Sequence, residues 1–94
     1  MYANLVTFNL APGKPKQREK LIQKFDPALK ATKGFKQVTF LGNDETGQGG
    51  ALMVWETKED AEAAFQAMFP QLQQALEGLV KEPPIRAVFE VIEP

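Results

Sequence analysis

Apolar and polar residues alternate from Tyr2 to Leu10, the pattern of an extended strand whose successive side chains point to opposite faces. One face would carry Tyr2, Asn4, Val6, Phe8 and Leu10, and the other Ala3, Leu5, Thr7 and Asn9. The strand is expected to end at the Ala-Pro-Gly of residues 11–13, because proline has no N–H to offer a sheet and glycine favours turns.

From Pro15 the spacing of apolar residues changes to three and four, which indicates an amphipathic helix. The residues that recur at this spacing are Leu21, Ile22, Phe25, Ala28 and Leu29. We expect the helix to bend or restart near Asp26, because Pro27 lacks the N–H of a helical residue, and Gly34 to end it.

A second helix is predicted to begin near Lys58, where Thr57 offers a hydroxyl as the N-cap. Its apolar residues at helical spacing are Ala61, Ala64, Phe65, Met68, Leu72, Leu76 and Leu79. Pro70 is expected to break it into a piece of about three turns and a shorter piece that ends around Gly78.

Three further segments are predicted to be strands. Residues 35–42 and 50–56 are rich in aromatic and β-branched residues, and the polar, glycine-rich residues 43–49 would join them as a hairpin. Residues 85–93 alternate as a fourth strand. The order βαββαβ predicts a ferredoxin-like α+β fold, in which two helices cover one face of a four-stranded antiparallel sheet; the 94 residues suit one such domain, 1–94.

The predicted sheet is apolar on both faces. Leu52 and Val54 alternate with Met53 and Trp55, and Val88 and Ile92 alternate with Phe89 and Val91. Two helices cover only one face, and an antiparallel sheet with its second face in water alternates more cleanly. We therefore expect a second copy of the chain to cover that face in a homodimer.

Composition excludes several kinds of chemistry. The chain contains no cysteine and no histidine, which removes disulfides, thiolate nucleophiles, the commonest general base and the usual haem ligands. The carboxylates at 44–45 and 59–62 lack the spacing of a calcium loop and are expected to be solvated. No metal and no other cofactor is predicted.

Charge is unevenly distributed, with a net +6 over residues 1–36 and a net −7 over residues 37–94. We interpret this as a basic first helix and an acidic second helix, both solvated, and expect no nucleic-acid partner because no aromatic residues lie among the lysines. The start of the chain has no basic region before an apolar stretch, and no run of eighteen apolar residues occurs. A cytoplasmic protein without a membrane partner is the expectation.

Three segments resemble the antibiotic biosynthesis monooxygenase (ABM) family of dimeric α/β barrel proteins. They are Ala11-Pro12-Gly13-Lys14 after the first strand, Lys33-Gly34-Phe35 at the second, and ALMVWETKEDAEAAF at 51–65. The resemblance covers essentially the whole chain. It implies a dimer that pairs the bare sheet faces, a pocket between sheet and helices in each subunit, and oxygenation of phenols or quinols without a cofactor.

Through this resemblance Trp55 would face the pocket, while a core tryptophan remains the alternative. Asn4 and Tyr2 are further catalytic candidates, although Asn4 would otherwise bond to backbone or solvent at a strand end. In the haem-degrading relatives that this resemblance includes, a strand-one asparagine lies in the pocket, and counting back from the Pro-Gly turn without gaps puts Val6 at its place. Val6, Phe8, Met53, Phe65 and Met68 would line the pocket. Arg86 alternates with Phe89 and is expected in a surface or dimer-interface salt bridge.

Two functions are therefore predicted side by side. In the first, the protein is a cofactor-independent monooxygenase that binds the anion of a small phenolic or quinol-type aromatic molecule and lets it react with dioxygen. In the second, it is a non-catalytic dimer that binds a small apolar ligand or a protein partner. The lack of an evident general base in the sequence favours the second, and the family resemblance favours the first.

Overall fold

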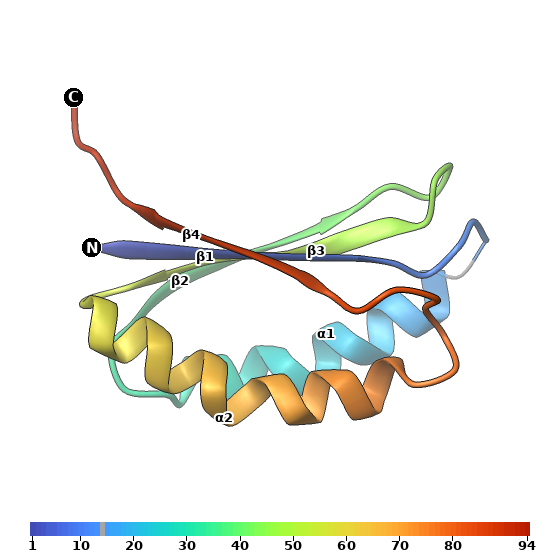
Figure 1. The fold of residues 1–94 in the computed structure, drawn as a ribbon, viewed down its shortest axis with the longest axis horizontal. Coiled ribbons are helices and arrows are strands. Elements are labelled where there is room, and N and C mark those ends of the chain that lie inside the picture. Colours follow the sequence, from blue (N-terminus) through green and yellow to red (C-terminus); the bar gives the residue numbers. More distant parts are fainter. Residues whose placement is uncertain (14) are drawn as a thin grey trace.

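A computed structural model describes residues 1–13 and 15–94. Its elements are β1 (Tyr2–Asn9), α1 (Pro15–Lys30), β2 (Phe35–Gly42), β3 (Gln48–Trp55), α2 (Lys58–Leu76) and β4 (Ile85–Glu90). The strands form one antiparallel sheet in the order β2-β3-β1-β4. Both helices lie on the same side of this sheet (Figure 1). The predicted ferredoxin-like α+β fold is confirmed.

The core lies between the sheet and the two helices. Its buried members come from every layer of the fold: Leu10, Leu21, Phe25, Leu29, Trp55, Ala61, Ala64 and Leu76. Residues opposite each other in neighbouring antiparallel strands share a face. Asn4 is opposite Met53 on β3 and Val88 on β4, so the predicted face of Tyr2, Asn4, Val6 and Phe8 is the one that meets the helices.

The other face of the sheet is bare and mostly apolar, with Thr7, Gln37 and Thr39 as polar members. Strand register places on it Ala3, Leu5, Leu52, Val54, Ile85, Ala87 and Phe89. Ile85 is 66% exposed and Phe89 is 52% exposed. Within residues 1–13 and 15–94 no segment crosses this face, and the chain after Glu90 rises away from it (Figure 1).

Both helices run through their prolines, so α1 does not restart near Asp26, and the predicted break at Pro70 is wrong. α1 continues past Pro27 to Lys30, and α2 is one helix of 19 residues. An internal proline costs a helix about 3 kcal/mol through one lost hydrogen bond and a steric clash. Both prolines are exposed, and burial of the opposite faces of the helices in the core offsets this cost.

Several boundaries differ slightly from those expected. β3 begins two residues before the predicted start at residue 50, and β4 ends at Glu90 instead of residue 93. The Thr57 cap is confirmed, since its hydroxyl accepts a hydrogen bond from the Asp60 N–H at 3.1 Å. After β4, the Val91 N–H bonds to the Met1 carbonyl.

Gly34 fastens the turn after α1 to the end of β3. Its φ of +82° lies in the region that favours glycine, and its carbonyl accepts a hydrogen bond from the N–H of Glu56 at 2.8 Å. A β-carbon at this position would overlap the side chain of Asp60, including the Asp60 Cβ. The turn therefore fixes the backbone at Glu56, the residue that follows Trp55 at the end of β3.

Gly34→Ala is expected to destabilise the fold more than Gly78→Ala does. Gly78 also has a positive φ, but a β-carbon there has nothing within 4 Å, so it reports the backbone cost alone, about 1–2 kcal/mol. The collision with Asp60 should add about 1 kcal/mol or more to the loss at Gly34. Urea unfolding of both variants measures the difference, and equal losses would contradict this role for Gly34.

Candidate functional site

An apolar cavity of about 90 Å³ lies between the sheet and the two helices. All five residues predicted to line a pocket do line it: Val6, Phe8, Met53, Phe65 and Met68. They come from β1, β3 and α2, and α1 and β2 complete the wall. Of the described residues that line it, three carry a polar side-chain group, namely Asn4, Arg18 and Trp55. The cavity is thus suited to an apolar or aromatic molecule that needs few polar contacts.

Trp55 belongs to the core and also lines the cavity. It is 1% exposed, and the ring of Phe35 meets its indole edge to face with centroids 5.8 Å apart. Its Nε1 is buried and has no hydrogen-bond partner among the described residues. Indole nitrogens in protein interiors normally find an acceptor, so this donor is an exception that calls for a partner.

Asn4 is buried at the wall of the cavity, with both ends of its amide in use. Its Nδ2 donates to the Ala61 carbonyl at 3.2 Å, and its Oδ1 accepts from Nη2 of Arg86 at 3.1 Å. These bonds fix which way the amide points, and they match the backbone-bonding alternative. An amide nitrogen carries two hydrogens, so one N–H is still available to a ligand.

Arg86 lies on the helix side of the sheet, which corrects the expected surface or dimer-interface salt bridge. It is opposite Val6 in the β1–β4 ladder, whereas Phe89 falls on the bare face. Its guanidinium bonds to both carboxylate oxygens of Glu62, at 2.8 and 3.3 Å, and stacks on the Phe65 ring at 4.0 Å. The salt bridge therefore joins β4 to α2 within one chain.

Glu62 is partly solvated, as expected, with 38% of its side chain exposed, and it also pairs with Arg86. The hydrogen bonds from the Arg86 guanidinium lower the pKa of the Glu62 carboxyl below its ordinary value of 4.5, and the positive charges of Arg86 and Lys58 add to this effect. Glu62 stays ionised, holds Arg86, and through Arg86 holds Asn4. This set of three residues, the Asn4–Arg86–Glu62 network, joins β1, β4 and α2 behind the cavity wall.

Tyr2, the third catalytic candidate, is separated from the cavity. It is opposite Trp55 on β1 and packs, partly buried, against the core, but it is not among the cavity-lining residues. The structure thus brings Trp55 and Asn4 to the cavity and leaves Tyr2 at its edge.

Arg18 lines the cavity and was not singled out from the sequence. It lies three and four residues before Leu21 and Ile22, on the side of α1 that faces the sheet. That spacing was the available signal, because a cation on the apolar side of an amphipathic helix is unusual. Its guanidinium bonds to Asp44 in the β2–β3 loop.

Within residues 1–13 and 15–94, no group of three or more carboxylates lies close enough to hold a metal ion. No helix there is long and apolar enough to cross a membrane.

Comparisons with known proteins place the fold. No family model and no curated protein matches the chain. A Nitrosomonas europaea protein assigned to the antibiotic biosynthesis monooxygenases superimposes with a TM-score of 0.81 at 15% identity, over 99% of this chain and 91% of that one. SnoaB, a cofactor-independent oxygenase from Streptomyces nogalater, gives 0.77 at 19% identity over 99% and 94%. The ActVA-Orf6 monooxygenase of Streptomyces coelicolor, solved with nanaomycin D, gives 0.69 at 20% over 99% and 91%.

The chain has the antibiotic biosynthesis monooxygenase fold. The resemblance found in the sequence is thereby confirmed for the fold. In this chain the antibiotic biosynthesis monooxygenase fold encloses the cavity at Trp55 and leaves the opposite sheet face bare.

Glu62→Gln should make the free energy of unfolding less sensitive to acid. Because the folded-state pKa is lowered, the Glu62 contribution is present above the unfolded carboxyl pKa of about 4.5 and disappears as pH falls through the folded value. The unfolding free energy of the parent should therefore drop more steeply than that of the variant from about pH 5 to about pH 3.

Urea unfolding at several pH values gives this slope. The control is Glu59→Gln, an exposed position on the same helix with no salt bridge among the described residues, and its slope should match the parent. A Glu62→Gln slope as steep as the parent's would contradict the role of Glu62.

Proposed function

We propose that this protein binds a small phenol or quinol in the cavity and oxidises it as a cofactor-independent monooxygenase. The observation that carries the proposal is the Trp55 Nε1 donor, buried without a partner among the described residues beside an apolar cavity. A buried unpaired N–H costs about 1–3 kcal/mol. A ligand oxygen that accepts this hydrogen bond offsets that free-energy cost, and a negatively charged oxygen offsets the most.

The cavity walls suit the chemistry of an ionised phenol. Aromatic and aliphatic side chains from both helices exclude water, so the Trp55 N–H acts on a phenolate more strongly than it would in solution. The available amide N–H of Asn4 is a second donor. These residues hold the anion and orient it, which is the contribution expected from a protein that uses no cofactor.

The reaction balances with dioxygen as the only co-reactant. The ring carbon of the phenolate bonds to one oxygen atom and a proton completes a hydroperoxide. The ring carbon then loses its hydrogen while the O–O bond breaks. One oxygen atom becomes the quinone carbonyl and the other leaves as water, so the four electrons taken from the phenol reduce one dioxygen.

A substrate has to displace side chains as it enters. The cavity of about 90 Å³ is smaller than the engineered cavity of about 150 Å³ that takes benzene in another protein. Met68 and Met53 line it, and methionine adapts readily because it has three rotatable bonds. We expect these side chains to make room for the ring.

The comparisons support this proposal by analogy. SnoaB is named as a cofactor-independent oxygenase, and ActVA-Orf6 was solved with nanaomycin D. Both share the fold of this chain.

Ligand binding without catalysis is the second candidate, favoured by the composition of the lining. Among the described residues that line the cavity there is no carboxylate and no tyrosine, and hence no evident general base. A monooxygenase of this design requires a substrate acidic enough to ionise by itself.

Oxygen uptake with naphthols and quinols separates the two functions. Trp55→Phe keeps an aromatic ring but removes the N–H, and should lower kcat/KM about 100-fold, the usual effect of losing one donor to a developing anion. Binding of the same compounds without oxygen uptake would favour the non-catalytic function. Oxygen uptake unchanged in Trp55→Phe would contradict the role of the indole.

We also propose that the protein is a homodimer, with the bare sheet faces packed together. The seven apolar residues of that face include Phe89 and Ile85, which are more than half exposed in the single chain. Contiguous apolar faces of this kind are rare on monomers. Pairing by twofold symmetry covers both copies at once.

Sedimentation equilibrium should give twice the chain mass of 10.5 kDa at micromolar concentration. Phe89→Asp places a charge in the interface and should give a folded monomer. Gln74→Asp adds the same charge at an exposed position on α2 and should leave the dimer intact. A monomeric parent protein would overturn the dimer.

A further inference from the structure

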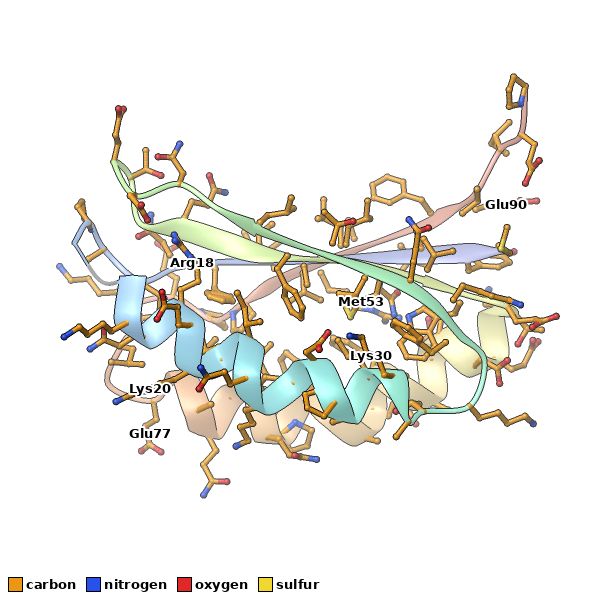
Figure 2. All side chains as sticks on the ribbon, turned by 180° about the vertical axis from the view of Figure 1, so that it is seen from behind. Arg18, Lys20, Lys30, Met53, Glu77 and Glu90 are labelled. Carbon is orange, nitrogen blue, oxygen red and sulfur yellow. The ribbon has the colours of Figure 1, made fainter. Side chains whose placement is uncertain are left out.

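Arg18 separates the cavity from a small hollow at the surface. Figure 2 shows its side chain extending from the start of α1 toward the sheet. The surface that lines the cavity is almost wholly apolar, so Arg18 contributes the methylene groups of its side chain to that lining. Its guanidinium lies in the surface hollow, with Asp44, Gly47 and Gly49. One side chain therefore forms the partition between the cavity and the surface hollow.

Two glycines of the β2–β3 hairpin keep the space that this side chain occupies. Gly42 and Gly49 are opposite each other at the ends of β2 and β3. A β-carbon on Gly42 would lie 2.6 Å from Nη1 and 2.8 Å from Cδ of Arg18, closer than real β-carbons approach other atoms. Neither glycine has a positive φ, so the backbone does not require glycine there. The guanidinium can lie against the sheet because these positions carry no side chain.

The partner of Arg18 holds it weakly. Among the described residues its guanidinium bonds only to Asp44 in the β2–β3 loop. The Asp44 side chain is 67% exposed and the Arg18 side chain is 28% exposed. Ion pairs with this much solvent around them contribute little to stability, and salt screens them. The arginine side chain has several rotatable bonds, so it can leave the hollow once the ion pair breaks.

The opposite end of the cavity is closed by the core. Gly49 precedes Trp55 by six residues on β3, which is about 20 Å along a strand. Trp55 is 1% exposed and Ala64, which also lines the cavity, is 2% exposed. An opening at Trp55 would expose buried apolar side chains to water, whereas an opening at Arg18 breaks one partly exposed ion pair. The hairpin end is therefore the end that opens at the lower cost.

We propose that Arg18 is a gate: its side chain closes the hairpin end of the cavity, Asp44 holds it closed, and a ligand enters and leaves when this ion pair opens. The proposal rests on ligand binding in the cavity, as proposed above. It does not depend on catalysis or on which small molecule binds.

A gate of this kind changes rates and leaves affinity unchanged. The ligand occupies the same cavity whether the gate is open or closed, so a weaker ion pair speeds entry and exit by the same factor. Asp44→Asn should raise the association and dissociation rate constants of a ligand about threefold each, which is what the small stabilisation by such an ion pair allows. The Kd should stay within about twofold of the parent value.

NMR titration with 2-naphthol under nitrogen measures these quantities. The chain has a single tryptophan, so its one indole N–H resonance reports binding beside Trp55, and its line shape through the titration gives both rate constants and the Kd. Nitrogen removes the dioxygen that a turnover would consume. Asp26→Asn is the matched control, because it breaks the Lys30–Asp26 ion pair on the same helix and should leave both rate constants at the parent value.

Two further variants show whether the effect passes through Arg18. Gly42→Ala puts a β-carbon where the guanidinium lies, so it should displace the side chain and raise both rate constants. Arg18→Ala removes the partition, should raise both rate constants at least as far, and should abolish the effects of Asp44→Asn and Gly42→Ala when combined with either. Asp44 is in an exposed loop, so Asp44→Asn keeps the test available if Arg18→Ala does not fold.

The outcomes separate the gate from the proposed function. If 2-naphthol shifts the indole resonance with the same rate constants in the parent, Asp44→Asn and Arg18→Ala, the gate is overturned and the cavity function stands. A Kd that changes in Asp44→Asn through the dissociation rate alone also overturns the gate, because the ion pair would then act on the bound ligand. No shift in the parent would overturn the cavity as a ligand site, and the gate with it.

Discussion

The whole site depends on one buried hydrogen-bond donor, the Trp55 N–H, for which the described residues offer no acceptor. The Trp55 ring is held by the edge of Phe35 and by its strand pairing with Tyr2, so its N–H is not free to turn toward water. Gly34 fixes the chain at the next residue through the Glu56 N–H. In the proposed function, a donor held so firmly beside an apolar cavity is preorganised for one oxygen atom of a ligand.

The two faces of the sheet have separate tasks. The inner face packs on the helices and carries the cavity, and the outer face is bare in the single chain. The Asn4–Arg86–Glu62 network lies on the inner side and joins β1, β4 and α2 by hydrogen bonds. A polar network that is nearly fully paired orients its members, and an available amide N–H of Asn4 is thereby placed at the wall.

Local patterns were enough to predict the order of the elements, and alternation in residues 2–10 sorted the β1 side chains into two faces. The choice of the face with Asn4, Val6 and Phe8 as the cavity side came from the family resemblance. Local patterns were not enough at Pro27 and Pro70, where packing overrides the local cost of proline. The sheet face on which Arg86 lies depends on how β4 pairs with β1, and its hydrogen-bond partner Asn4 is 82 positions away in the sequence. The position of Arg18 against the sheet could not be predicted, because it depends on glycines of the β2–β3 hairpin that are far away in the sequence.

A crystal structure of the protein with 2-naphthol tests the central claim most directly, namely that the cavity at Trp55 is a ligand site. We expect the naphthol ring against Met53 and Phe65, with its oxygen within about 3.2 Å of Trp55 Nε1. Naphthol bound outside the cavity, or a Trp55 Nε1 that bonds to a protein acceptor in the crystal, would contradict it.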